Sequence, residues 1–200
     1  MPRYAAHSGG SKTSLPVELV LEVPQGYLIE RLDTTLHSRT GFSCGTEALD
    51  KYLETQASQA QDKNLSTTHV LLDANAQSSP QRQIIGYVTL TPATLPLVDA
   101  PSALKKSTNR PEVQVQLIAR MAVDHRYQGK KLGQFLLNFA LKCCWDISRL
   151  SAFSVVIVDA KDENVKNFYI RFGGFQELRE RSLRLYLPIG SIGKLLSSHK

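Results

Sequence analysis

The sequence predicts a mixed α/β protein (α+β) in which helices flank one central, mostly antiparallel sheet. Two neighbouring runs rich in β-branched and aromatic residues, Thr67–Asp73 and Ile84–Thr91, are joined by a polar loop and indicate an antiparallel hairpin. A strand–helix–strand–helix succession follows the hairpin and adds a parallel crossover to the sheet. The length of 200 residues suits one domain of this kind.

The first part of the chain is expected to supply a leader, a strand and a helix. Residues 1–24 are rich in Gly, Ser and Pro and lack the apolar core of a secretory signal, so we expect a flexible leader. Within it, Val17–Val23 is a candidate for an extra edge strand. Tyr27–Leu32 is a short strand candidate. Thr46–Lys63 carries apolar residues at helical spacing and predicts a helix, with Thr46 as its N-cap.

The second part carries the strongest strand and helix signals. The proline-rich segment 92–111 predicts a loop with one short helix near Ala103–Lys106. Val113–Val123 begins with strict alternation and becomes continuously apolar, as a central strand does. The elements expected after it are a helix at Gly133–Leu150, a strand at Phe153–Val158, a helix at Glu163–Phe172 that Gly173 and Gly174 end, and a strand at Leu183–Leu187. The domain is thus expected to span residues 25–190, with a polar, frayed tail over 191–200.

Composition excludes several protein classes. No apolar run approaches the roughly 18 residues of a membrane span, so we expect a cytoplasmic protein. Cys44, Cys143 and Cys144 give an odd number with two adjacent, which indicates reduced thiols, and no spacing predicts a metal site. Residues 1–100 carry 7 Lys and Arg against 10 Asp and Glu, whereas residues 101–200 carry 17 against 8. A basic half suits nucleic acid or a phosphate-bearing cofactor, although charge scatter alone also produces such an imbalance.

The turn after the central strand is the most informative stretch. The strand ends near Asp124, a helix opens near Lys131, and Gly129 and Gly133 let the backbone approach a ligand closely. Backbone N–H groups and the helix dipole at such a turn bind phosphate. The cations beside it are Arg126, Lys130 and Lys131. Taken alone, such a turn is also typical of an ordinary helix start, and it matches neither the Walker loop nor the dinucleotide fingerprint.

This turn resembles motif A of the GNAT family of N-acetyltransferases, Gln/Arg-x-x-Gly-x-Gly/Ala after the fourth strand. It reads Gln128-Gly129-Lys130-Lys131-Leu132-Gly133, so Lys131 stands where the central glycine is usual. A side chain there is expected to need a helical backbone and to turn away from or around the phosphate. Asn167–Phe175 resembles motif B, F-Y-x-x-x-G-F, with one inserted glycine. The resemblance covers Tyr27 to Leu187 and implies acetyl-CoA as cosubstrate, no metal, and fourth and fifth strands that splay apart.

The resemblance also implies roles for individual residues. The pantetheine arm lies between the splayed strands, the turn holds the pyrophosphate, and the following helix contacts the cofactor from the other side. The cofactor-binding residues so implied are Met121, Ala122, Val123, Gln128, Gly129, Lys130, Lys131, Leu132, Gly133, Gln134, Asn164 and Phe168. Tyr169 matches the position of the general acid that protonates the departing thiolate. The alternative is that Phe168 and Tyr169 are an aromatic pair that anchors a helix.

A second resemblance lies nearer the N-terminus. The segment from His37 to Leu53 follows roughly the pattern F-x-C-G-x-x-x-L-D-x-[YW]-L of the TacT/AtaT-type toxins, and Ala119–Asp124 resembles their G-R-L-A-V-D strand. These toxins acetylate the α-amine of aminoacyl-tRNA. The resemblance implies three candidate partners: aminoacyl-tRNA, a ribbon-helix-helix antitoxin and a second copy of the chain. It also places Arg120 where it can hold a phosphate near the acceptor end of the tRNA.

Three functions therefore stay open at the level of the sequence. The first is an aminoacyl-tRNA N-acetyltransferase toxin. The second is an N-acetyltransferase of a small amine, a peptide or a protein lysine, which the long leader and the insertion at 92–111 favour. The third is a non-catalytic acyl-CoA-binding module, which the lysine at position 131 keeps open.

Overall fold

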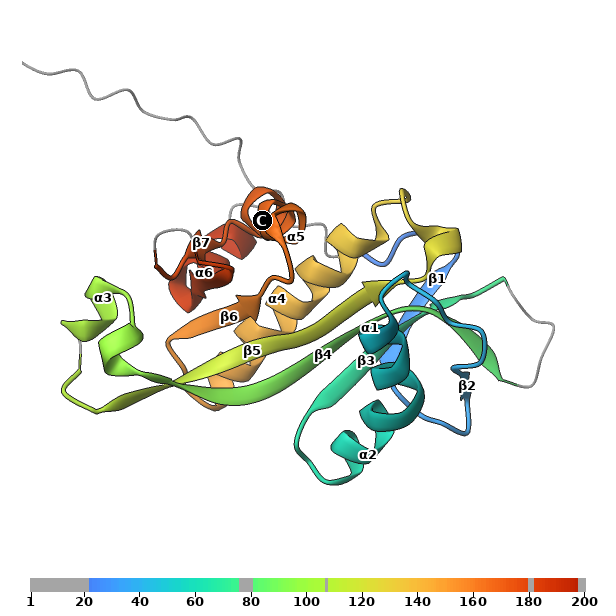
Figure 1. Cartoon of the computed structure of the whole chain (residues 1–200), viewed down its shortest axis with the longest axis horizontal. Coiled ribbons are helices and arrows are strands. Elements are labelled where there is room, and N and C mark those ends of the chain that lie inside the picture. Colours follow the sequence, from blue (N-terminus) through green and yellow to red (C-terminus); the bar gives the residue numbers. More distant parts are fainter. Residues whose placement is uncertain (1–21, 76–80, 107, 180–181, 198–200) are drawn as a thin grey trace, which may run out of the picture.

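The structure is a computed structural model that describes residues 22–75, 81–106, 108–179 and 182–197. One sheet runs in the order β1-β3-β4-β5-β6-β8-β7, and the short β2 pairs with β4 (Figure 1). The strands are β1 (Tyr27–Arg31), β2 (His37–Ser38), β3 (Thr67–Asp73), β4 (Arg82–Pro96), β5 (Glu112–Val123), β6 (Val155–Asp159), β7 (Gln176–Glu177) and β8 (Arg184–Pro188). Among the strand pairs formed by the described residues, only β5–β6 and β2–β4 are parallel, which confirms the mixed, mostly antiparallel sheet.

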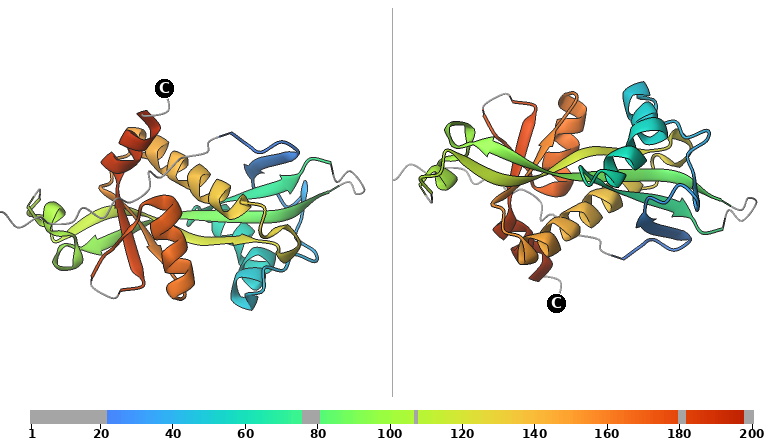
Figure 2. Two further views of the ribbon diagram at one scale, coloured as in Figure 1. Left: turned by 90° about the horizontal axis from the view of Figure 1, so that it is seen from above. Right: turned by 90° about the horizontal axis from the view of Figure 1, so that it is seen from below.

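The helices form a layer on each face of the sheet. They are α1 (Glu47–Lys51), α2 (Ala57–Asp62), α3 (Ser102–Lys105), α4 (Leu132–Leu150), α5 (Glu163–Gly173) and α6 (Ile189–Ser197). Figure 2 shows α4 and α6 on one face, and α1, α2 and α5 on the other. No helix in the described part of the chain is both long and apolar enough to cross a membrane. Most of residues 17–23, the candidate extra strand, lie outside the described residues.

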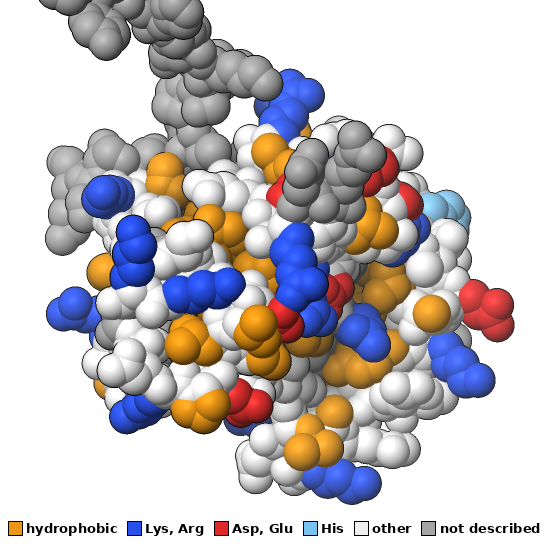
Figure 3. Space-filling model, turned by 60° about the vertical axis from the view of Figure 1, so that its left-hand side comes forward, with side chains coloured by type: hydrophobic (Ala, Val, Ile, Leu, Met, Phe, Trp, Pro, Cys, Tyr) orange, Lys and Arg blue, Asp and Glu red, His pale blue; other side chains and the backbone are white. Residues whose placement is uncertain are grey.

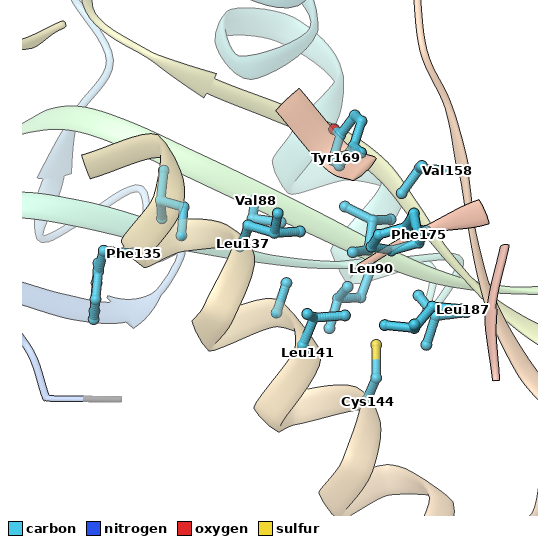
Figure 4. Close-up of a cluster of buried hydrophobic side chains, with 14 of the residues drawn as sticks. Val88, Leu90, Phe135, Leu137, Leu141, Cys144, Val158, Tyr169, Phe175 and Leu187 are labelled. Carbon is cyan, nitrogen blue, oxygen red and sulfur yellow. The ribbon is translucent and has the colours of Figure 1, made fainter. Parts of the chain in front are cut away.

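The main core lies between α4 and the sheet (Figure 4). Leu137, Leu141 and Cys144 on α4 are fully buried and pack with Val88 and Val158 of the strands. Each such aliphatic side chain stabilises the fold by roughly 1.5–3 kcal/mol. Cys144 packs in this core as a small hydrophobic residue, and burial raises the pKa of its thiol.

The predicted helix over 46–63 is interrupted. A π-helical turn, Tyr52–Gln56, separates α1 from α2. The wider turn puts Tyr52 against the fully buried Tyr87, with ring centroids 6.2 Å apart. Thr46 holds the predicted N-cap position, but its side chain makes no capping hydrogen bond. The single continuous helix expected here is therefore wrong in its middle turn, where tertiary packing prevails over local propensity.

The predicted loop over 92–111 is also shorter than expected. Strand β4 continues to Pro96 and pairs with β5 as far as Glu112, so only the tip with α3 is irregular. The prolines misled the sequence analysis because proline is confined to strands with a free edge. Here β3 ends opposite Leu90, so β4 beyond that point is hydrogen-bonded on one side alone.

The frayed tail expected over residues 191–200 is wrong for residues 191–197. Residues 189–197 form α6, which packs on α4 and fully buries Ile192. Gly193 lies so close to Trp145 that an added Cβ would meet the indole at 2.5 Å. The apolar residues Ile189, Ile192 and Leu195 recur at helical spacing among serines and glycines, which made the segment look polar.

Candidate active site

The site begins where β5 and β6 part. The two strands pair from Val115–Val155 to Ile118–Val158 and then separate, so residues 119–123 of β5 have no strand neighbour on that side. A cavity of about 410 Å³ opens there, lined by β5 residues 118–123 and by Tyr169 and Val165 of α5. The parting of the fourth and fifth strands that the sequence resemblance implies is thus present, as β5 and β6.

Tyr169 lies in the wall of this cavity and is 7% exposed. Its ring contacts Phe168 and Phe175 edge to face, with centroids 5.5 and 5.7 Å away. Burial raises the pKa of its hydroxyl to about 12. The hydroxyl is therefore protonated throughout the neutral range, which is the form that a general acid needs. Tyr169 thus packs against neighbouring aromatic rings and also borders the cavity.

The turn after β5 is tied to the segment before α1. The buried carboxylate of Asp124 accepts hydrogen bonds from the Ser43 N–H and from the Arg126 backbone and guanidinium. Burial alone would raise the pKa of Asp124, but these hydrogen bonds outweigh it and lower the pKa below its usual value. Gln128 donates to the carbonyls of Cys44 and Val123. Asp124 thus caps the turn, and Arg126 is engaged by it instead of standing free beside the turn.

A second cavity, of about 330 Å³, lies at the N-terminus of α4. It is lined by Val123, Tyr127, Gln128, Gly129, Lys131, Leu132, Gly133, Gln134, Phe168 and Phe172. Val123 and Gln128 line both cavities, so the two are neighbours. The first helical hydrogen bond runs from Phe135 N–H to the Lys131 carbonyl, which leaves the preceding N–H groups of the helix for a ligand.

Lys131 does not have the helical backbone expected for it. Its φ and ψ are 60° and 10°, in the left-handed region that glycine adopts freely. This conformation explains why glycine is usual at that position of the motif. A lysine there keeps the shape of the turn, at the cost of backbone strain.

Two cations stand at the mouth of the larger cavity. Arg120 is exposed, lies with its guanidinium 5.4 Å from the centre of the Tyr52 ring, and donates to the carbonyl of Ala119. Lys161, which follows β6, donates to the Thr46 hydroxyl at 3.0 Å and so bridges from the α5 side to the start of α1. Lys161 was not among the predicted site residues, although the carboxyl ends of two parallel strands meet at one edge of a sheet.

The structure gathers most of the predicted site residues at the two cavities. Met121, Ala122, Val123 and Arg120 line the larger one. Two predicted cofactor-binding residues line neither cavity. Asn164 is exposed in the first turn of α5, and the Lys130 ammonium lies over the Tyr127 ring at 4.8 Å. The prediction omitted several lining residues: Cys44, Thr46, Ala48, Leu49, Ile118, Ala119, Asp159, Lys161 and Val165 in the larger cavity, and Tyr127 and Phe172 in the smaller one.

A metal centre is not indicated in the part of the chain that the structure describes. No group of three or more His, Cys, Asp or Glu side chains is placed there to hold an ion. The two cavities instead suit an elongated ligand with a phosphate at the α4 end and an uncharged arm along the free edge of β5. Acetyl-CoA has this build.

Comparisons with known proteins agree with this geometry. The family model of the acetyltransferase (GNAT) family matches residues 37–175. A tRNA-acetylating toxin of Mycobacterium tuberculosis is 27% identical over 147 residues, which are 74% of this chain and 84% of the toxin. The solved structure of AtaT complexed with acetyl-methionyl-tRNAfMet is similar with a TM-score of 0.74 and 26% identity, covering 85% of this chain and 99% of AtaT.

A further structure of AtaT contains a protein partner. It is a Tyr-to-Phe variant of the AtaT toxin bound to the C-terminus of the antitoxin AtaR, with a TM-score of 0.70 and 25% identity over 85% of this chain and 98% of the toxin. The family model covers both the parted strands and the turn at the start of α4. The chain therefore belongs to the acetyltransferase (GNAT) family, whose cosubstrate is acetyl-CoA.

Proposed function

We propose that this protein transfers the acetyl group of acetyl-CoA to the α-amine of aminoacyl-tRNA and acts as a toxin. The observation that carries the proposal is the buried Tyr169 hydroxyl beside the free edge of β5, in a chain similar over most of its length to tRNA-acetylating toxins. The cosubstrate's pantetheine arm lies along Met121 to Val123, adding a strand-like partner to β5. Its phosphates lie at the turn from Gln128 to Gln134, with Phe168 beside them.

The chemistry needs one neutral amine and one proton donor. The amine attacks the thioester carbon, the carbon–sulfur bond breaks, and the thiolate leaves with the electron pair. Tyr169 gives its proton to that thiolate and is restored by the proton that the amine loses. In water a tyrosine near pKa 10 is a weaker acid than a thiol near 8.5. Burial disfavours a thiolate as well as a tyrosinate, so the pKa of a thiol released in this cavity rises as that of Tyr169 does.

The acceptor side carries positive charge that suits tRNA. Arg120 and Lys161 lie at the mouth of the cavity, where the terminal phosphates of an acceptor end would pass. Figure 3 shows a face of the molecule on which Lys and Arg side chains are more frequent than Asp and Glu. The single carboxylate lining the cavity, Asp159, is paired with Arg184 at 2.6 Å. Phosphate therefore meets little opposing charge at this entrance.

Two further assignments accompany the proposal. A toxin of this kind needs a neutralising partner, and the AtaT relative was solved with its antitoxin, so we propose an antitoxin of the ribbon-helix-helix type for this chain. Charged tRNA is found in the cytoplasm, which is therefore the proposed location of the protein.

The test uses purified protein, labelled acetyl-CoA, and matched pools of charged and uncharged tRNA. We expect label on charged tRNA only. Tyr169→Phe should lower the rate by about 10²-fold or more, the range for loss of a general acid. Tyr186→Phe is the matched control, because the Tyr186 hydroxyl donates to Gln176 and lines neither cavity.

Two results of this acetylation assay would contradict the proposal. Acetyl-CoA binding without any label on charged tRNA would rule out the tRNA substrate, and label on polyamines or protein lysines would then identify the alternative acceptor. Equal rates for the Tyr169→Phe variant and the wild type would remove Tyr169 from the catalytic step.

A further inference from the structure

The two neighbouring cavities set the direction in which acetyl-CoA lies. With its phosphates at the turn before α4, the acyl arm runs back along β5 from Val123 toward Ala119. The last pair between β5 and β6 is Ile118 with Val158, so the arm ends where the two strands meet. The acetyl group is therefore expected beside the residues that directly follow this pair, and beside Tyr169, which lines the same cavity.

Asp159 is the residue of β6 that directly follows this last pair. Its side chain and that of Lys161 line the larger cavity, whereas Val158 and Ala160 belong to the main core. Among the described residues that line this cavity, Asp159 carries the only carboxylate, and Arg120 and Lys161 carry the cations. One group that attracts positive charge thus lies at the end of the cavity where the acetyl group is expected.

Arg184 of β8 holds this carboxylate in place. The two residues are direct partners in the β6–β8 register, and the guanidinium donates to both carboxylate oxygens, at 2.6 and 2.8 Å. Such a bidentate pair fixes the orientation of the carboxylate. A carboxylate has about four lone-pair sites and this pair occupies two, so the oxygens of Asp159 can accept further hydrogen bonds. The Asp159 side chain is 49% exposed, so a substrate that enters the cavity can reach it.

We propose that the carboxylate of Asp159 binds the amino group of the acceptor, and that Arg184 is its positioning residue. The inference rests on the proposed function and names the group that receives its amine. A neutral amine can donate one N–H to the carboxylate while its lone pair points at the thioester carbon. As the carbon–nitrogen bond forms, the nitrogen becomes positive and its hydrogen bond to the carboxylate strengthens. The contact is therefore stronger in the transition state than in the ground state, which accelerates the reaction.

The proton balance of the transfer stays as described for the proposed function. The carbon–sulfur bond breaks, the sulfur takes the proton of Tyr169, and the proton that the nitrogen loses restores Tyr169. Asp159 takes no proton in the net reaction. Its negative charge attracts an amine or ammonium group more strongly than a hydroxyl or an amide. The site therefore selects a primary amine and binds the acetylated product, an uncharged amide, less tightly.

The experiment compares two ligands that differ only in this group. One is charged tRNA, and the other is the same tRNA esterified with the α-hydroxy analogue of its amino acid. Their Kd values are measured with the protein saturated with CoA, so that no transfer occurs. We expect the wild type to bind the aminoacyl form about five- to tenfold more tightly near neutral pH, where an α-amine is partly protonated. Asp159→Asn should bind both forms alike and should lower kcat/KM for acetylation about five- to twentyfold.

Two further variants separate the amine contact from general effects. Asp146→Asn is the matched control, because Asp146 is also an exposed carboxylate in an ion pair, with Lys142 at 2.6 Å, but lines neither cavity of the site. It should keep the preference and the rate of the wild type. Arg184→Gln leaves the charge of Asp159 but releases its side chain, so it should keep the preference and lower kcat about two- to fivefold. All three variants should bind acetyl-CoA as the wild type does.

An unchanged preference in Asp159→Asn would overturn the inference, whatever the acetylation rates are. Equal binding of the two tRNA forms by the wild type would overturn it as well. Failure of the proposed function gives a different result, because the wild type then acetylates no charged tRNA. The same comparison is in that case made with the amine that the protein does acetylate and the corresponding alcohol, and it decides the role of Asp159 by the same criterion.

Discussion

Replacing Lys131 by glycine should stabilise the ligand-free protein. The left-handed backbone at φ 60° costs a non-glycine residue about 1–2 kcal/mol, and glycine avoids this cost. Glycine in turn gives the unfolded chain more freedom, which offsets about 0.4–1 kcal/mol. The net gain is about 0.5–1 kcal/mol. For a domain of this size that corresponds to a rise in Tm of about 1–4 °C.

The assay is urea and thermal unfolding without ligand, since a change in midpoint at constant m reports stability. Lys131→Gln removes the charge but keeps the backbone demand, so the difference between the two variants isolates the strain. Gly129→Ala is the reverse control. Its φ is 79° and an added Cβ meets no atom within 4 Å, so it should destabilise through the backbone alone, by about 1 kcal/mol. If Lys131→Gly is less stable than Lys131→Gln, the strain argument is refuted.

Three further outcomes are expected. Ile192→Ala should lower the free energy of unfolding by about 2–4 kcal/mol, because a fully buried side chain of α6 leaves a cavity, and a change under 0.5 kcal/mol would show that α6 is not packed in solution. Asp124→Asn should remove stability that the wild type has above about pH 4 and loses as the pH falls through the lowered pKa of Asp124, so unfolding at pH 7 and pH 3 should differ less in the variant. Burial and then Asp50 raise the pKa of Cys44 to about 11, and burial does the same for Cys143, so both thiols should alkylate about 100-fold more slowly at pH 7.5 than a free cysteine; rapid modification of the folded protein would contradict this.

Strong local patterns were enough to predict the centre of this fold. The alternation and apolar run of β5 predicted the central strand, and the glycine-bearing turn predicted a phosphate-binding start of α4. The role of Tyr169 came from the family resemblance alone and stays a prediction. The errors occur where long-range packing decides. The prolines of β4 are tolerated because β3 ends early, the π-helical turn follows from the fit of Tyr52 on Tyr87, and α6 exists because Trp145 and the main core receive it.

The position of Lys161 shows the same limit within the site. Nothing near it in the sequence points to Thr46, 115 residues earlier, yet the two side chains meet across the cavity. The positive φ of Lys131 could not be predicted from the sequence for a related reason. A motif reports which residue type is usual, whereas the sign of φ depends on how the whole turn closes onto the helix.

Because β5 separates from β6, the backbone of residues 119–123 should open to solvent faster than the rest of the central sheet. Residues 119–123 keep β4 on one side, but the alternate N–H and C=O groups that face the gap meet solvent in the ligand-free protein. Their amide hydrogens should exchange with deuterium fastest within the centre of the sheet. Acetyl-CoA, by occupying the gap, should slow them selectively while the hairpin of β3 and β4 is unaffected. The segment of the central sheet least protected from hydrogen exchange would then be the segment that binds the cosubstrate.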